Sequence, residues 1–449
     1  MQFELTQSYL EDISSAVASN NDQFIREHIC VLHPADLAEI FDKISLDEVK
    51  FIYHLLDEEK QSDTLVELEE DVREQFLESL TSKEIAEQVD NMDTDDAADV
   101  IGELSEEQQE EVIAHLEDEE HSSDIVDLLT YDEDTAGGLM AKELIKANIN
   151  WPVNRTVIDM RRQAKDINRV HSIYVVDANN VLKGILSLKS LLFASPKDII
   201  GDIYMEGAKN VHTSATQEEV IKTMEKYDMV VLPVVDDEGV LVGRITIDDV
   251  VDVIKEEAEK DYQMAAGLSQ DVDADDSIAQ QTKARLPWLI LGLFGGLAAV
   301  FIMEGFEEAL VKYKQLFFFT PLIAAMAGNV GVQSSAIIVQ GIANDNLTDK
   351  PLKRLIREIS LSLINGTVLG LLVILAGYIF NFDLLFSVTV AVSMLCVIIV
   401  AALIGTFIPL LLNKKGIDPA LATGPFITTS NDIFGIFIFF YIAKLILGF

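Results

Sequence analysis

The chain divides near residue 286 into an acidic half and a neutral, almost continuously apolar half. Residues 1–286 hold 66 of the 75 acidic residues and 24 of the 33 Lys and Arg residues, so the whole net charge of −42 lies there. Residues 287–449 carry nine residues of each sign. Carboxylates at this density repel one another and oppose compaction unless cations neutralise them. The division therefore predicts a membrane protein whose soluble part is held in shape by cations.

The same composition argues against several functions. An acidic surface repels nucleic acid, so no nucleic-acid partner is expected. The N-terminus has neither a basic region nor an apolar core typical of a signal peptide, so we expect the soluble half to stay in the cytoplasm. Cys30 and Cys396 fall in different halves, which argues against a disulfide framework. The seven His residues have no metal-ligand or protease spacing.

Five apolar stretches in the neutral half are long enough to cross a membrane. Four have no charged residue and the fifth has one, and each reaches the ~18 residues typical of a spanning helix. Basic residues gather at Lys283 and Arg285, at 353–357 and at 414–415, which obeys the positive-inside rule if the N-terminus is cytoplasmic. The C-terminus then lies on the extracellular side. The expected spans are about 286–304, 316–343, 356–380, 384–412 and 419–446.

The fifth stretch carries a carboxylate, Asp432, deep in the predicted span. At 1.5 Å per residue it lies roughly 16–20 Å from either end, where an ionised group costs at least about 2.5 kcal/mol, so such residues usually line a pathway. Gly424 and Pro425 precede it and would free a backbone carbonyl in a polar cavity. Thr428 and Asn431 add further oxygens to the predicted ion path. The alternative is a structural aspartate that is hydrogen-bonded between helices.

The second stretch is interrupted by the polar phrase AGNVGVQSSA. Gly328 and Gly331 weaken a helix, and we expect a break there, with Asn329 and Gln333 lining the pore. Close packing of small residues is the alternative for the glycines and serines. Two protomers on a two-fold axis would place two Asp432 side chains around one path. Because these ligands are all oxygen atoms, they favour magnesium, calcium or manganese over zinc or copper.

Residues 1–132 contain short amphipathic segments with related phrases, as in 40–57 and 88–104. Such echoes are typical of stacked helical hairpins, which predicts an all-α superhelix. Asp95 and Asp99 are spaced i and i+4, so they share one helix face and repel each other unless a cation or basic group intervenes. Asp95 as an ordinary first-turn acid of a helix is the alternative.

A repeat with a period of 59 residues occupies 138–254, where 172–192 matches 231–251 and Gly184 aligns with Gly243. Each unit predicts a strand, a turn, a second strand and a helix, and two units would pack as one α+β domain. The connector that follows is expected to be helical up to Leu268, with a possible break at Gly267. Its acids either form a solvated face or bind cations shared with the neighbouring domains.

This order of parts resembles the MgtE family of magnesium channels over nearly the whole chain. The most specific matches are AGNVGVQSS in the second span and GIDPALATGPFITTSNDIFG in the fifth, and the repeated VVD…G pattern is typical of tandem CBS domains. The resemblance implies a multi-domain fold: an all-α N-domain, an α+β CBS pair and an α-helical membrane domain. The predicted limits are 1–132 for the N-domain, 133–201 and 202–254 for the CBS units, 255–285 for the connecting (plug) helix and 286–449 for the five spans.

The resemblance also implies a homodimer in which the second and fifth spans line one pore, with the pore aspartate at Asp432. In the family, intracellular magnesium bridges acids of the N-domain, the CBS domain, the plug and the membrane mouth, and so holds the channel shut. For the N-domain ligands we choose Asp95 and Asp99. Thr216 stands where the family often has an acid, and Lys260 interrupts the plug acids, so the set of bridges stays open. The remaining matches are Glu218, Asp228, Asp249, Asp252, Glu257, Asp261 and Asp418.

CBS pairs often bind adenine nucleotides through a Gly-x-x-Thr/Ser-x-x-Asp signature. The second unit has it in full at Gly243, Thr246 and Asp249, whereas the first has Ser187 but Ser190 in place of the acid. ATP binding at the pair and a purely metal-controlled module are therefore alternatives. Asp249 cannot easily serve both roles at once.

Taken together, these features predict a magnesium-selective channel that imports Mg²⁺ across the plasma membrane and is gated shut by cytoplasmic Mg²⁺. The alternative is a secondary transporter that exchanges divalent cations, Mn²⁺ and Co²⁺ included, against H⁺ or Na⁺. An intramembrane aspartyl protease would need paired carboxylates, and the spans offer one deep aspartate per chain, so we do not expect an enzyme.

Overall fold

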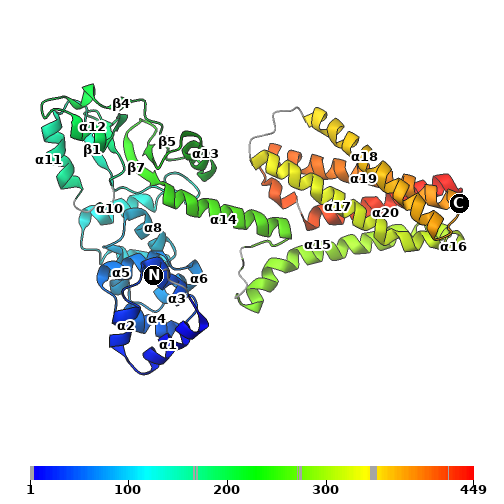
Figure 1. Ribbon diagram of the computed structural model, residues 1–449, viewed down its shortest axis with the longest axis horizontal. Helices are drawn as coiled ribbons and strands as arrows, with labels where there is room; N and C mark the ends of the chain where they lie inside the picture. The colour runs from blue at the N-terminus through cyan, green and yellow to red at the C-terminus, as the bar shows by residue number, and fades with distance from the viewer. Residues whose placement is uncertain are drawn as a thin grey trace. The chain divides into compact units, whose positions relative to one another are not determined.

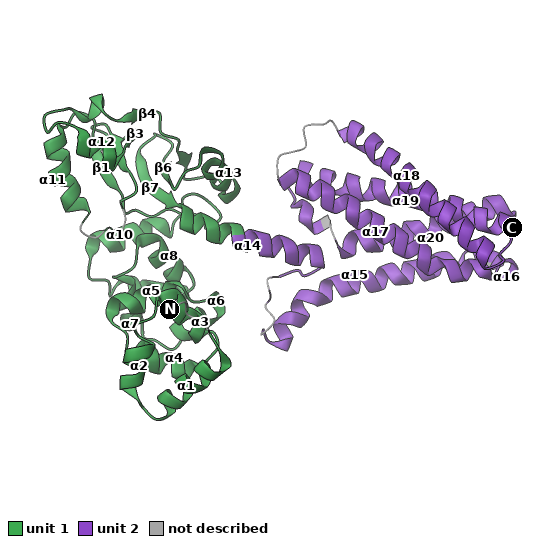
Figure 2. Ribbon diagram, viewed as in Figure 1, with its two compact units in different colours: residues 1–254 green, residues 255–449 purple. Residues whose placement is uncertain are grey.

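The computed structural model describes residues 5–449 apart from 165–166, 168–169, 271, 273–275, 344–350 and 423. It forms two compact units, residues 1–254 and 255–449, which Figure 2 distinguishes by colour. The first unit holds a helical domain and two α+β repeats, and the second holds the long apolar helices (Figure 1). This division agrees with the multi-domain fold predicted from the sequence.

The helical domain consists of short helices whose starts are set by local capping. Ser45 and Thr81 each begin a helix with a capping box, in which a glutamate three residues later bonds back to the cap. Helices two apart in chain order pack together, as α3, α5, α7 and α9 do, which makes the expected superhelix. The helices are α1 (Gln7–Ala18), α2 (Asp22–His28), α3 (Pro34–Phe41), α4 (Leu46–Tyr53), α5 (Glu58–Val66), α6 (Glu70–Leu77), α7 (Ser82–Val89), α8 (Thr94–Gly102), α9 (Glu106–Ile113) and α10 (Glu119–Leu128).

The two repeats have the same strand pairing. In each, the first strand runs parallel to the second and the second antiparallel to the third, and Val175 pairs with Gly184 as Val234 pairs with Gly243. The first repeat contains β1 (Ile145–Asn148), α11 (Val153–Gln163), β2 (Ile173–Val176), β3 (Leu182–Leu186), α12 (Leu188–Phe193), η1 (Ile200–Asp202) and β4 (Met205–Glu206). The second contains β5 (Val211–His212), α13 (Gln217–Tyr227), β6 (Val231–Val235), β7 (Leu241–Thr246) and the start of α14 (Ile247–Ala266).

The helical domain and the second repeat share one hydrophobic core. Ile101 of α8 and Leu128 of α10 belong to the same buried cluster as Leu232 of β6 and Val250 of α14. The first repeat has a separate core around Ile173. Because the shared core joins α8 to the start of α14, acidic residues of these two helices come close together.

Within its described residues, the second unit contains five helices long and apolar enough to cross a membrane, as the sequence predicted. The first begins at Ile278, earlier than the charge boundary, because Ser277 and Gln280 form a capping box there. The helices are α15 (Ile278–Glu304), α16 (Glu307–Lys312), α17 (Gln315–Ala343), α18 (Pro351–Ile379), α19 (Leu384–Lys414), η2 (Pro419–Ala422) and α20 (Pro425–Leu447).

Two local expectations for these helices were wrong. The second span is not broken, because α17 runs through Gly328 and Gly331 without interruption. Pro425, which the sequence placed inside the fifth span, begins α20, where its missing N–H costs nothing. Asp432 is therefore the eighth residue of α20, about 10 Å from its start and about 22 Å from its end at 1.5 Å per residue.

A candidate ion pathway and its neighbouring acids

The start of α20 is shaped by Gly424. This residue has φ 56° and ψ −127°, a conformation that favours glycine, and it turns the chain from η2 into the helix. The hydroxyl of Thr428 donates to the carbonyl of Gly424 at 2.9 Å, so that carbonyl bonds within the first turn. The predicted pathway residues Gly424, Pro425 and Thr428 thus form one end of the fifth span.

The threonines of α20 pack against glycines on two other helices. A Cβ on Gly328 of α17 would lie 3.2 Å from the methyl group of Thr428, and a Cβ on Gly295 of α15 would lie 2.0 Å from that of Thr429. Asp432 follows these two threonines by one turn on the same face and is half-buried. None of the ion pairs found among the described residues includes Asp432. Among the described residues of one protomer, no ion pair therefore neutralises the negative charge of Asp432.

The polar residues of α17 divide between two faces. Asn329 and Gln333, spaced i and i+4, are exposed on the outer face of the helix. Ser334 is buried and donates to Glu358 of α18 at 2.6 Å. Exposed amides on a membrane helix need water or protein partners, because lipid offers none. The outer face of α17 is therefore suited to a water-filled path or to contact with another protomer.

Asn431 differs from the other predicted pathway residues. Its side chain is 1% exposed and packs against Gly331 of α17, inside the protomer. The glycines of α17 thus accommodate close helix packing, which is the alternative that the sequence left open.

The end of α14 lies against the start of α20 within the second unit. A Cβ on Gly267 would lie 2.4 Å from Cγ of Pro425, and a Cβ on Gly424 would lie 2.4 Å from the carbonyl oxygen of Ala265. Gly267 has φ 86° and ends α14, which confirms the predicted break. The connecting helix therefore closes directly on the first turn of the helix that carries Asp432.

Acids gather beside this contact. Burial raises the pKa of Asp261, and repulsion from Asp418 and Glu257 adds to the increase. Asp418 accepts a hydrogen bond from the backbone N–H of Ala420 at 2.7 Å, which fixes its carboxylate at the start of η2. In the second unit, three predicted metal ligands, Glu257, Asp261 and Asp418, thus influence one another electrostatically.

In the first unit, carboxylates of α8 meet the start of α14. Burial raises the pKa of Asp95 and Asp96, and their mutual repulsion and the charge of Asp249 raise it further. The pKa of Asp99 is raised to about 7 by the surrounding protein atoms and by nearby carboxylates, although the residue itself is exposed. The predicted residues Asp95, Asp99 and Asp249 therefore belong to one electrostatic cluster. Among the described residues, however, no three such side chains converge in a geometry that would hold a metal ion.

Sequence reasoning missed two members of this cluster, Asp96 and Glu143. Asp96 adjoins Asp95, so the phrase TDDAADV contained a signal for it. Glu143 accepts hydrogen bonds from the backbone N–H and the hydroxyl of Thr94, at 3.0 and 2.8 Å. It comes from the segment before β1, and no local pattern could have placed it beside α8.

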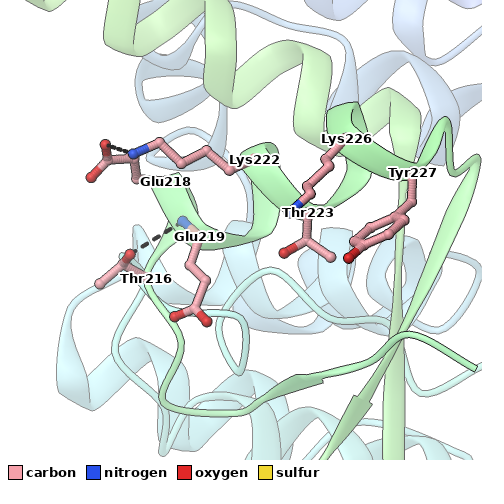
Figure 3. Close-up of a pocket in the computed structure, with 7 residues that line it drawn as sticks. All are labelled: Thr216, Glu218, Glu219, Lys222, Thr223, Lys226 and Tyr227. Atoms are coloured by element: carbon pink, nitrogen blue, oxygen red, sulfur yellow. Dashed lines mark hydrogen bonds and ion pairs between the residues drawn. The ribbon is translucent and has the colours of Figure 1, made fainter. Parts of the chain in front are cut away.

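The remaining predicted acids stand apart from this cluster. Glu218 lies in the first turn of α13 and Asp228 follows its last residue, so about 15 Å of helix separates them. Glu218 forms an ion pair with Lys222 at 2.7 Å (Figure 3), and both residues line an open hollow of about 420 Å³. Asp252 is exposed on α14, and Glu257 lies 3.4 Å from Lys260. Within one protomer, the structure does not bring Glu218 and Asp228 to a common site.

The predicted nucleotide-binding residues make hydrogen bonds or packing contacts within the protein. The hydroxyl of Thr246 donates to the carboxylate of Asp249, which also accepts the backbone N–H of Thr246 at 3.2 Å. Ser187 caps α12 by accepting the N–H of Ser190 at 3.0 Å. A Cβ on Gly243 would lie 2.6 Å from the sulfur of Met140, so the glycine is required for packing. A nucleotide phosphate would have to replace the Thr246–Asp249 contact.

Family models match most of the chain. "MgtE intracellular N domain" matches residues 32–134, "CBS domain" matches 136–197 and 200–256, and "MgtE: Divalent cation transporter" matches 320–442. Proteins called magnesium transporter MgtE are similar over comparable lengths. The protein from Bacillus subtilis is 35% identical over 70% of each chain, and that from Enterococcus faecalis is 36% identical over 73% of this chain and 72% of its own.

Two solved structures resemble the soluble part. The cytosolic domain of the Mg²⁺ channel MgtE in complex with ATP has a TM-score of 0.51 at 32% identity, and the match covers 54% of this chain and 99% of that one. The soluble part of a magnesium transporter has a TM-score of 0.50 at 27% identity, with 56% of this chain and 99% of the other covered.

Proposed function

The chain belongs to the MgtE family of magnesium transporters, and we propose that it is a Mg²⁺-selective channel that imports the ion and is closed by cytoplasmic Mg²⁺. One observation carries this proposal: the end of α14 lies directly against Gly424 and Pro425, eight and seven residues before Asp432. Because α14 begins in the soluble part and ends against α20, the helix that carries Asp432, it can transmit the state of the soluble part to the pathway.

The pathway of the proposed channel runs past Asp432, Thr428, Asn329 and Gln333, with Gly424 and Pro425 at its cytoplasmic mouth. Asp432 is half-buried without a basic partner among the described residues, and the two amides are exposed on α17. A second protomer would cover these polar groups and bring a second carboxylate to the path. Because Mg²⁺ gives up its water reluctantly, the channel would pass a largely hydrated ion through contacts with its bound waters.

A homodimer is supported by apolar side chains that the soluble part leaves uncovered. Leu192 and Phe193 of α12 are 81% and 84% exposed, and Ile158 of α11 is 69% exposed. In the second repeat, Val251 and Ile254 of α14 are also exposed. Equivalent helices of two repeats that expose apolar residues suit an isologous contact with a second copy.

The proposed gate works by population shift. With little Mg²⁺, the carboxylates around Asp95, Asp99 and Asp249 and those around Asp261 and Asp418 repel one another, which favours separation of the parts and withdrawal of α14. Mg²⁺ that binds the compact arrangement more tightly moves the population towards the closed state. Glu218, Asp228, Asp252 and Glu257 would serve as further ligands, including between protomers. ATP at Thr246 and Asp249 would compete with Mg²⁺ for the same carboxylate.

The test is electrical recording from membrane patches that contain the full chain, with cytoplasmic Mg²⁺ varied. The proposal expects a Mg²⁺ current that falls as cytoplasmic Mg²⁺ rises, and that is lost in Asp432→Asn. A coupled transporter is the second candidate, because one deep carboxylate can also carry a proton. Uptake into vesicles separates the two: a channel needs a Mg²⁺ gradient alone, and strict dependence on a proton or sodium gradient would rule the channel out.

A further inference from the structure

Asn431 is buried in a place that is unfavourable for a polar side chain. It is 1% exposed, and neither atom of its amide group has a hydrogen-bond partner among the described residues. A buried amide without partners loses its hydration and gains nothing in return. Positions that break such a rule are often functional or strained sites. The side chain therefore requires an explanation other than its contribution to stability.

The contact that Asn431 makes is a close approach of α20 to α17. A Cβ on Gly331 would lie 1.7 Å from Nδ2 of Asn431 and 2.8 Å from Cγ2 of Ile427. On the third helix of this junction, α19, a Cβ on Gly405 would lie 2.3 Å from the carbonyl oxygen of Gly331. The flat amide thus lies on a residue without a side chain, where three helices meet. Such a contact leaves α20 little freedom to rotate.

The rotation of α20 decides where the next residue points. Successive residues of an α-helix are separated by roughly 100° around its axis. With Asn431 directed to Gly331, Asp432 is turned to the half-exposed side of α20, which it shares with Thr428 and Thr429. If α20 rotated towards α17, the carboxylate of Asp432 would move into the protomer. If α20 rotated the other way, the carboxylate would move towards α15.

We propose that Asn431 is a positioning residue for the ion path: its amide, lying on Gly331, sets the rotation of α20 and so directs Asp432 to the passing ion. This inference rests on the proposed function, in which Asp432 contacts the ion. It changes the role predicted for Asn431 from the sequence, because the residue acts through its neighbour and does not line the path.

The test is a double-mutant cycle on the full-length protein in liposomes. Gly331→Ala adds a methyl group against the amide, and Asn431→Ala removes the amide. The double variant replaces the contact between the amide and Gly331 by a contact between two alanine methyl groups. Gly370→Ala is the matched control, because a Cβ there meets Cβ of Ala391 at an ordinary 3.5 Å between α18 and α19. For each variant, Mg²⁺ uptake, its half-saturating concentration, the preference for Mg²⁺ over Ca²⁺ and the thermal midpoint are measured.

We expect each single substitution to change the half-saturating concentration or the Mg²⁺ preference by about tenfold or more, since small misplacements of an aligned group have effects of at least this size. The double variant should recover most of the loss, and the control should match the wild type. Because Asn431→Ala introduces no clash, it keeps the test valid if Gly331→Ala fails to fold.

Two results would overturn this inference and leave the proposed function standing. The first is single variants that unfold at lower temperature but keep the wild-type ion preference and half-saturation, which would make Asn431 a packing residue only. The second is a double variant whose losses are the sum of the single ones. A wild-type protein that carries no Mg²⁺, or that is unaffected by Asp432→Asn, would instead overturn the proposed function and this inference with it.

Discussion

Gly267→Ala should make the proposed channel harder to close. Gly267 ends α14 with φ 86°, and its missing side chain is what allows Pro425 to approach. An alanine Cβ would lie 2.4 Å from Cγ and 2.9 Å from Cδ of the proline ring, far inside the distance of a normal contact. Because the ring is rigid and begins α20, the clash can be relieved only by moving one helix away from the other.

The size of the effect follows from the clash. Overpacking of this kind costs about 1–3 kcal/mol, and a penalty of that size, applied only to the docked arrangement, lowers the closed-to-open ratio by about 5- to 150-fold. Alanine at a positive φ adds backbone strain, but this strain is present whether or not α14 is docked. Gly416→Ala is the matched control, because Gly416 has φ 70° and nothing lies within 4 Å of its added Cβ.

Patch recording measures the cytoplasmic Mg²⁺ concentration that halves the current. This concentration should rise in Gly267→Ala, remain near the wild-type value in Gly416→Ala, and fall back when Pro425→Ala is combined with Gly267→Ala, since the second substitution removes the opposing ring. If Gly267→Ala closed at the wild-type Mg²⁺ concentration or a lower one, docking of α14 on α20 would not be the closed state.

Three further predictions concern the ion path, the acids and the dimer. Asp432→Asn should abolish most of the Mg²⁺ flux while the protein still folds, as checked by uptake and thermal unfolding; flux and ion preference equal to the wild type would remove the residue from the path. The pKa of Asp99 is raised to about 7 by the surrounding protein atoms and by neighbouring carboxylates, so the metal-free protein should lose stability as pH rises from about 4 to about 7. Asp99→Asn should flatten this slope in thermal unfolding with a chelator, and an unchanged slope would contradict the raised pKa of this carboxyl group. Phe193→Glu should weaken self-association measured by light scattering in detergent, whereas Val31→Glu, at a residue 65% exposed on the helical domain, should not; equal association in both variants would move the interface elsewhere.

Features that depend on residues close together in the sequence were predicted correctly. The five membrane helices follow from uninterrupted apolar composition, and the two repeats from a period of 59 residues that the strand register preserves in full, with Val175 opposite Gly184 and Val234 opposite Gly243. The end of α14 at Gly267 follows from the conformational freedom of glycine. Each of these signals is contained in a short window of the chain.

Expectations about the inside of the membrane unit failed where packing overrode local propensity. Gly328 and Gly331 lower helix propensity, yet α17 is continuous because its hydrogen bonds must be satisfied internally in lipid and because α20 packs into the space that the glycines leave. Pro425 was expected inside the fifth span, where it would free a backbone carbonyl, but a turn at Gly424 places it at the first helical position, where it is tolerated.

The sequence by itself determined that one half of the chain is acidic, that the other half contains five apolar stretches long enough to cross a membrane, and that one aspartate lies within the fifth stretch. Composition and periodicity suffice for this, because hydrophobic burial and helix formation act on adjacent residues. Only the tertiary structure decided that Glu143 joins the acids of α8, that Asn431 turns inward onto Gly331, and that α14 ends against Pro425. These contacts join residues far apart in the chain, and they depend on how whole helices pack, which no local pattern encodes.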